Sequence, residues 1–266
     1  MVFSLFRSRK RERLRAAPFP DDWRRTIERN VPIVLRLPPS DREELFGHVQ
    51  VFLAEKHFEG VGGLELTDEI RVTIAAQACL LLLHRDTDYY PLLKSIIVYP
   101  STYVVPEEHS IGGGIWEEGE DELLGHTSRS LSALVLAWDS TLHGARDMGD
   151  GENVVLHEFA HQLDFEQGDV NGTPTLESNG QYASWARVLG AEYDALRRAS
   201  DEGRPSVLDD YGAENPAEFF AVATEAFFER PVELRAKHAA LYEELRAFYQ
   251  QDPASWARDI TAPSTT

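Results

Sequence analysis

The chain has 266 residues, of which 42% are hydrophobic, and this is enough apolar material for a folded core and excludes wholesale disorder. Its 26 Lys and Arg residues against 45 Asp and Glu residues give a formal charge of −19, which argues against binding of the nucleic-acid backbone as the main activity. The single cysteine, Cys79, excludes an intramolecular disulfide and any zinc site built from cysteines.

The N-terminal segment is strongly basic, because residues 1–15 hold six Arg and Lys side chains against a single acid, Glu12. These side chains repel one another and the segment has few apolar residues, so we expect residues 1–17 to form a disordered tail. No apolar stretch of the kind found in signal peptides follows it. The longest apolar run, 78–83, is far shorter than the roughly 20 residues that span a bilayer. The sequence therefore predicts a cytoplasmic protein without a membrane span.

Helices are the expected elements up to about residue 93. A capping box at 40–43 begins a helix with apolar side chains at helical spacing, and the glycines from Gly60 onward end it. A second helix begins near Thr67 and is apolar on nearly all sides, which is typical of a buried helix. Cys79 lies on this helix and is expected to be a core residue.

Strands are expected in the middle of the chain. Residues 96–99 and 134–138 are rich in β-branched, aliphatic and aromatic side chains, and the Gly-rich acidic stretch at 112–125 is expected to be an exposed loop. Further helical patterns follow at about 152–164, 182–199, 216–229 and 233–250. Because helices precede and follow a few strands, the predicted fold class is α+β rather than a series of alternating βαβ units.

A His-Glu-x-x-His pattern indicates metal chemistry. His157 and His161 lie four residues apart within an apolar helical pattern, 154–163, so both imidazoles reach one side of the helix and one ion at about 2.0–2.1 Å. Glu158 follows the first histidine and is placed to hold a water molecule and accept its proton. Two surface histidines beside a glutamate are the alternative interpretation. Since the flanking apolar residues indicate a buried helix, where histidines need partners, we expect one zinc ion here.

A catalytic zinc ion needs a third protein ligand and one open position. The position six residues after the motif is Gln167, and the next histidine in the chain is His238, so a carboxylate on a later helix is expected. Pro216 can open such a helix at its first turn. Glu218 and Glu225 lie two turns apart on one face of it, and both are candidates. A simple dipole partner at the helix start is the alternative role of Glu218.

Two segments resemble the Mlc titration factor A (MtfA) family of bacterial zinc peptidases. They are VVLHEFAHQLD at 154–164 and YGAENPAEFFAV at 211–222. Shorter stretches at 51–56, 68–79 and 248–253 are also similar to that family, so the resemblance covers roughly Pro18 to Pro253. It implies a gluzincin whose catalytic core is similar to that of anthrax lethal factor.

The resemblance also implies a role for each residue of the site. His157, His161 and Glu218 would hold one zinc ion per chain. Glu158 would be the general base, and Tyr211 would stabilise the oxyanion.

The carboxylate that orients a zinc ligand is left open. The residue four positions after Glu218 is Val222, not the acid found in the thermolysin pattern. Glu225 and Asp164 are both candidates for this orienting role, and the sequence does not distinguish between them.

The implied fold is a zincin-like metallopeptidase fold, mostly helical, with a small mixed sheet beside the helix of the His-Glu-x-x-His motif. We expect one metallopeptidase domain at 18–256, with a helical part at about 18–93 and a catalytic part at about 94–256. Residues 257–266 are expected to be a flexible C-terminus.

The expected activity is hydrolysis of peptide bonds by a zinc-activated water, with broad or aminopeptidase-like specificity toward peptide or protein substrates. The family is named for sequestering Mlc, a glucose-repressor protein, so the resemblance also implies a Mlc-like transcriptional repressor as a partner. A non-catalytic protein that titrates such a repressor is the alternative function. Glu158 and Tyr211 favour the enzyme, because a binding module needs no base beside its metal. Direct binding of nucleic acid is not expected.

Overall fold

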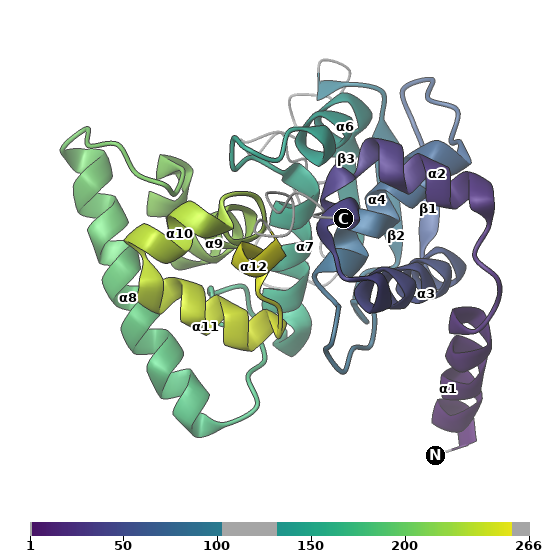
Figure 1. Ribbon diagram of the computed structural model, residues 1–266, viewed down its shortest axis with the longest axis horizontal. Coiled ribbons are helices and arrows are strands. Elements are labelled where there is room, and N and C mark those ends of the chain that lie inside the picture. Colours follow the sequence, from purple (N-terminus) through teal and green to yellow (C-terminus); the bar gives the residue numbers. More distant parts are fainter. Residues whose placement is uncertain (1, 103–131, 257–266) are drawn as a thin grey trace, which may run out of the picture. The chain divides into compact units, whose positions relative to one another are not determined.

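The computed structural model describes residues 2–102 and 132–256, and Figure 1 shows their helices and strands. The chain divides into two compact units. The single metallopeptidase domain expected at 18–256 stays a prediction. One unit consists of Met1–Leu83 and Leu93–Arg146, and the other of His84–Leu92 and Asp147–Thr266.

The first unit combines helices with a small sheet. Its elements in chain order are α1 (Val2–Arg15), α2 (Asp21–Asn30), η1 (Pro32–Arg36), α3 (Pro39–Glu55), β1 (His57–Gly60), α4 (Asp68–Leu80), β2 (Ser95–Tyr99), β3 (Ala133–Ala137) and α6 (Trp138–Arg146). The helices expected after the capping box and after Thr67 are α3 and α4. The hydroxyl of Thr67 caps α4 by accepting a hydrogen bond from Ile70 N, and Cys79 is buried within this helix, as predicted.

The described strands pair in parallel, in the order β1-β2-β3, rather than in the mixed sheet that was expected. The register aligns Ser95 with His57 on one side and with Ala133 on the other. Ile96 and Val98 are fully buried, which agrees with the apolar run that predicted β2. Parallel pairing needs a crossover connection, and α4 supplies it between β1 and β2.

The strand pairing crosses the boundary expected between the helical part and the catalytic part. β2 and β3, which begin the expected catalytic part, pair with β1 of the expected helical part. Backbone hydrogen bonds therefore join segments on both sides of residues 93–94. The chain passes between the two units at Leu83–His84, at Leu92–Leu93 and at Arg146–Asp147.

The basic N-terminal segment forms a helix, α1, rather than the disordered tail expected for residues 1–17. Arg11 is only 9% exposed, and its guanidinium donates two hydrogen bonds of 2.8 Å to the carboxylate of Glu55, at the end of α3. Burial raises the pKa of Glu55, but the hydrogen bond and charge of Arg11 outweigh it and hold that pKa below its usual value. The repulsion among the basic side chains is therefore offset by a partly buried ion pair.

The second unit is helical in its described residues. Its elements are α7 (Val154–Asp164), η4 (Phe165–Gln167), α8 (Asn179–Asp201), η5 (Asp210–Ala213), α9 (Pro216–Glu229), α10 (Pro231–Lys237), α11 (Ala239–Tyr249) and α12 (Pro253–Trp256). Helix α9 has the bounds that the sequence predicted. The helix expected at 233–250 is two helices instead, because His238 adopts φ −131° and ψ 53° and its ring pairs with Glu192 of α8.

Aromatic side chains fill the core of the second unit. Trp185 of α8, Phe220 of α9 and Phe248 of α11 meet edge to face, with ring centroids 5.5–5.8 Å apart. Phe227 of α9 and Tyr249 of α11 stack with a centroid separation of 5.6 Å. These contacts hold α9 against its neighbours and so fix the helix that carries Glu218.

Residues 103–131 and 257–266 lie outside the described part of the chain. The loop expected at 112–125 and the flexible C-terminus expected at 257–266 fall there. Among the described helices, none is both long enough and apolar enough to cross a membrane.

We predict that Arg11→Gln destabilises the chain by about 1.5–3 kcal/mol, the usual range for hydrogen bonds to a charged partner. Because the pKa of Glu55 is lowered, its contribution is present above its unfolded value of 4.5 and is lost as the pH falls. Chemical denaturation at about pH 7 and about pH 3 measures both effects, and the loss should be smaller at the lower pH. Arg13→Gln, which removes an exposed charge from the same helix, is the control. Equal stability of the two variants would contradict a stabilising role for the ion pair.

Candidate metal centre

Helix α7 carries the His-Glu-x-x-His motif and begins at a strong cap. The side chain of Asn153 accepts hydrogen bonds from Val155 N at 3.1 Å and Leu156 N at 3.0 Å, two of the donors that a helix start leaves unpaired. The buried apolar side chains of this helix are Val155, Leu156, Phe159, Ala160 and Leu163. The motif therefore lies on a buried, well-anchored helix rather than on a surface helix.

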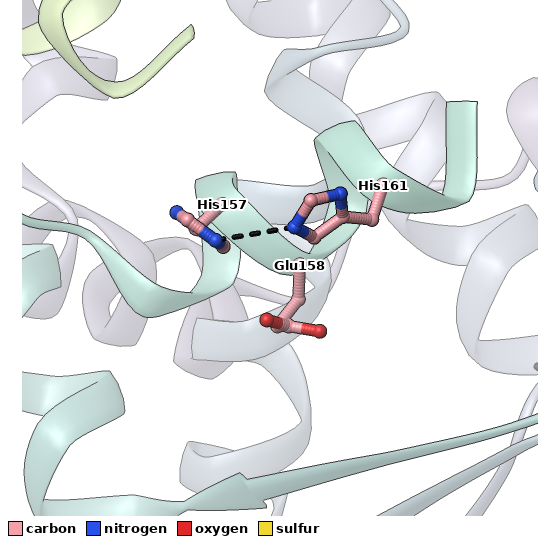
Figure 2. Close-up of side chains that lie close together, drawn as sticks. All are labelled: His157, Glu158 and His161. Atoms are coloured by element: carbon pink, nitrogen blue, oxygen red, sulfur yellow. Dashed lines mark hydrogen bonds between the residues drawn. The ribbon is translucent and has the colours of Figure 1, made fainter. Parts of the chain in front are cut away.

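His157 and His161 lie on successive turns of α7. Figure 2 shows their imidazoles joined by a dashed line, with the carboxylate of Glu158 beside them. The ring centroids are 4.9 Å apart, and the two Nε2 atoms are 3.2 Å apart. The structure thus brings the two histidines of the motif together at one point.

Glu218 reaches this point from α9. An Asn215 cap and Pro216 in the first turn begin the helix, which places Glu218 at its N-terminal end. Glu218 Oε2 lies 3.0 Å from His157 Nε2 and 3.4 Å from His161 Nε2. Together with the 3.2 Å between the nitrogens, these distances make a nearly equilateral triangle of three ligand atoms.

The triangle fits a tetrahedral metal ion. An ion about 2.0–2.1 Å from each ligand atom would separate these atoms by roughly 3.3–3.4 Å. The observed separations of 3.0, 3.2 and 3.4 Å are close to that value. Two imidazole nitrogens and one carboxylate oxygen are a donor set typical of catalytic zinc, with the fourth position left for water or substrate. The residues that would hold the ion are His157, His161 and Glu218.

The charges around the triangle also favour a cation. Burial would lower the pKa of His157, but hydrogen bonds to Glu218 and Glu225 raise it to about 10. Burial would raise the pKa of Glu218, but its hydrogen bonds to the two histidines lower it to about 2. At neutral pH, His157 therefore holds a proton between two carboxylates, and a metal ion that binds here must displace that proton.

Glu225 holds the other side of the His157 ring. Its Oε2 lies 2.9 Å from His157 Nδ1, and its Oε1 accepts a hydrogen bond of 2.7 Å from Asn153 N. This bond leaves Nε2 of the ring for a ligand, which is the usual arrangement of a metal-binding histidine. His161 Nδ1 is buried without a comparable partner among the described residues.

Asp164, the other acid considered for this orienting role, anchors a loop instead. It is 1% exposed, and its carboxylate accepts hydrogen bonds from Gly172 N at 2.6 Å and Thr173 N at 2.8 Å. Of the two candidates, the geometry therefore favours Glu225 as the residue that orients a histidine.

Two neighbours of Glu225 were not predicted from the sequence. Asn153 Nδ2 donates a hydrogen bond of 3.0 Å to Glu229 Oε1. Burial raises the pKa of Glu229 to about 9, so this side chain is a neutral acid at neutral pH. A signal was present, because Glu218, Glu225 and Glu229 recur at a spacing that puts all three on one face of a helix.

Glu158 lies beside the two histidines of the motif. It is 5% exposed, and its Oε1 has no hydrogen-bond partner in the part of the chain that the structure describes. Glu158, His157 and His161 each offer an atom within 4.8 Å of the other two. Burial raises the pKa of Glu158, although the charges of the two histidines oppose this shift. A raised pKa suits a group that accepts a proton and later returns it.

Tyr211 lies in η5, directly before α9. The side chain of Asp209 accepts a hydrogen bond of 2.8 Å from Tyr211 N and so fixes this turn. The ring centroid of Tyr211 is 6.0 Å from that of His157. Burial, together with nearby carboxylates that include Glu218, raises the pKa of Tyr211 to about 12. The phenol therefore stays protonated and can act as a hydrogen-bond donor.

Comparison with known proteins agrees with this chemistry. A family model described as glucose-regulated metallo-peptidase M90 matches residues 6–250. A protein of Synechocystis sp., described as uncharacterized, is 39% identical over 236 residues, which is 89% of this chain and 86% of that protein. Two proteins named Mlc titration factor A are each 30% identical: that of Klebsiella pneumoniae over 86% of this chain and 86% of its own, and that of Yersinia pestis over 84% and 83%. The chain therefore belongs to the glucose-regulated metallo-peptidase M90 family, which confirms the resemblance to Mlc titration factor A.

Proposed function

We propose that this metallopeptidase is a zinc-dependent peptidase with His157, His161 and Glu218 as its metal ligands. The observation that carries the proposal is the triangle of three ligand atoms, 3.0–3.4 Å apart, on two capped helices. Membership of a metallopeptidase family supports a divalent metal and peptide substrates. Among divalent metals, the nitrogen and oxygen donors and the tetrahedral spacing favour zinc.

The residues around the triangle divide the catalytic work. When bound, zinc supplies a Lewis acid that polarises the scissile carbonyl and acidifies water. Glu158 holds the attacking water, accepts its proton and returns that proton to the leaving amine. Tyr211 donates its phenol hydrogen to the carbonyl oxygen as negative charge develops there. Glu225 keeps the ring of His157 in the orientation that presents Nε2.

Broad or aminopeptidase-like cleavage of peptides is the proposed activity. The printed name of the Klebsiella and Yersinia relatives supports a second candidate function, binding of a Mlc-like transcriptional repressor. Such binding needs neither Glu158 nor Tyr211, so variants of these two residues separate the two functions.

We predict one zinc ion per chain in the wild type and loss of that ion in Glu218→Ala, because the third ligand is removed. Glu225→Gln should keep the ion but bind it about 10–100-fold more weakly, since the contact that orients His157 is changed. Elemental analysis and competition with a chromophoric chelator measure both effects. Glu214→Gln, which alters an exposed acid just before α9, should bind zinc as the wild type does. Full occupancy of Glu218→Ala at limiting zinc would exclude this ligand set.

Glu158→Gln should keep the fold and the zinc but lose hydrolysis by about 10²–10⁴-fold, the usual contribution of a general base. The amide is nearly isosteric with the acid, so the substitution tests proton transfer. Turnover per bound zinc on peptide reporters is the measurement. The same variant mixed with a Mlc-type repressor should bind it as the wild type does if that second function exists. Hydrolysis near the wild-type rate would assign the base to another residue.

Tyr211→Phe should lower kcat by about 10²–10³-fold and leave KM and zinc content nearly unchanged, because the hydrogen bond forms mainly in the transition state. Steady-state kinetics measure kcat and KM, and a thermal melt on the same sample measures stability. Tyr193→Phe removes a phenol that hydrogen-bonds the carbonyl of Ala213, so it controls for lost packing around η5. If Tyr211→Phe only lowers the melting temperature, as the control should, the residue is structural.

A further inference from the structure

A pocket of about 440 Å³ opens beside Glu218, between the loop that follows α7 and the first turn of α9. Its lining residues are Val170, Asn171, Asn215, Pro216, Ala217 and Glu218. The side chain of Val170 is 40% exposed, which leaves an aliphatic surface uncovered next to a proposed metal ligand. The proposed hydrolysis chemistry does not use this surface.

The loop that carries Val170 is held in place by several contacts. Asp164 of α7 accepts hydrogen bonds from two of its backbone N–H groups, and Trp185 Nε1 donates a hydrogen bond of 2.9 Å to Gly172 O. Gly172 has φ +77° and approaches α9 so closely that a Cβ atom there would lie 2.2 Å from Pro216 O. The loop is therefore a fixed wall, and the exposure of Val170 is a preformed feature of the pocket.

Two amide groups of the pocket are oriented by the backbone. Asn171 Oδ1 accepts a hydrogen bond of 3.1 Å from Thr173 N, and Asn215 Oδ1 accepts one of 3.0 Å from Glu218 N. Because both oxygens face the backbone, the Nδ2 groups point away from it, and neither has a partner among the described residues. Unpaired amide donors in a pocket are suited to the carbonyl oxygens of an extended peptide.

The charge of the pocket selects among side chains. Glu218 lines it as a proposed metal ligand, and among the described residues that line it none is basic, so an acidic side chain would find no cationic side chain to pair with in the lining. The carboxylate of Glu218 is directed at the two histidines, so it does not offer a free partner to a basic side chain. Val170, Pro216 and Ala217 instead provide an apolar surface.

We propose that this pocket is the subsite for a substrate residue next to the scissile bond, and that it selects uncharged aliphatic side chains. Val170 contacts the side chain of that residue, while Asn171 and Asn215 donate hydrogen bonds to the peptide backbone. This inference rests on the proposed peptidase function, and it adds the substrate class to it.

Val170→Phe tests the proposal by filling the pocket. A mixture of synthetic peptides is digested by the wild type and the variant, and mass spectrometry maps the residues beside each cleaved bond. We expect cleavage next to leucine to fall about 10–100-fold in kcat/KM, mainly through KM, while cleavage next to alanine falls less. Asn171→Ala should raise KM about 3–10-fold for all peptides, the scale of one hydrogen bond. Val232→Phe is the matched control, because Val232 is 49% exposed on α10 and does not line the pocket.

A binding measurement separates this proposal from the peptidase function. Zinc-loaded Glu158→Gln, with and without Val170→Phe, is titrated with fluorescent tripeptides that carry leucine, alanine, glutamate or lysine in the centre. Preference for leucine that is lost with Val170→Phe supports the pocket, even if the wild type hydrolyses nothing and the peptidase proposal fails. Hydrolysis with the same selectivity in Val170→Phe and Val232→Phe, or a preference for charged residues, overturns the pocket and leaves the peptidase intact. Absence of both hydrolysis and binding overturns both.

Discussion

The hydrogen bond between Glu225 and His157 ties together the two helices on which the proposed metal site depends. One oxygen of this carboxylate lies 2.9 Å from His157 Nδ1, and the other accepts a 2.7 Å hydrogen bond from Asn153 N, at the start of α7. Glu218 lies two turns earlier on the same face of α9, so the contact made by Glu225 also sets where Glu218 meets the histidines. The site geometry therefore follows from the register of two helices and requires no special loop conformation.

The contact between Glu225 and His157 lies among buried acidic side chains. Burial of these carboxylates is unfavourable unless positive charge balances their negative charge. Glu158, Glu225 and Glu229 are each only 5–6% exposed. Protons relieve part of this charge, since burial raises the pKa of Glu158 and raises that of Glu229 to about 9. His157 holds a further proton through its hydrogen bonds to two carboxylates. A divalent ion at the triangle would take over this balancing role, so binding of the metal and release of a proton are linked.

Local patterns made much of the site predictable from the sequence. The spacing of His157 and His161 is a local signal, and so is the helix start at Pro216. Spacing alone did not decide whether Glu218 or Glu225 is the third metal ligand, and only the family pattern favoured Glu218. The parts that the sequence did not predict depend on distant contacts. Helix α1 is ordered by the pairing of Arg11 with Glu55, a residue 44 positions away. Strand β1 has only four residues and is stabilised mainly by its pairing with β2. The helix break at residue 238 is also accompanied by a distant contact, between the ring of His238 and Glu192.

Helix α7 connects the proposed metal site with the neighbouring pocket, because it is anchored at both ends by polar side chains. Asn153 at its start contacts Glu225, and Asp164 at its end holds the loop of Val170. Gly172 then brings this loop back against the start of α9, so α7, the loop and α9 form a closed path of contacts around the site. A misplacement of about 1 Å can cost an enzyme about 100-fold in rate. A closed path of this kind keeps the distance between the pocket wall and the proposed metal ligands constant, so the contacts that build the triangle of ligand atoms would also set the position of a bound peptide.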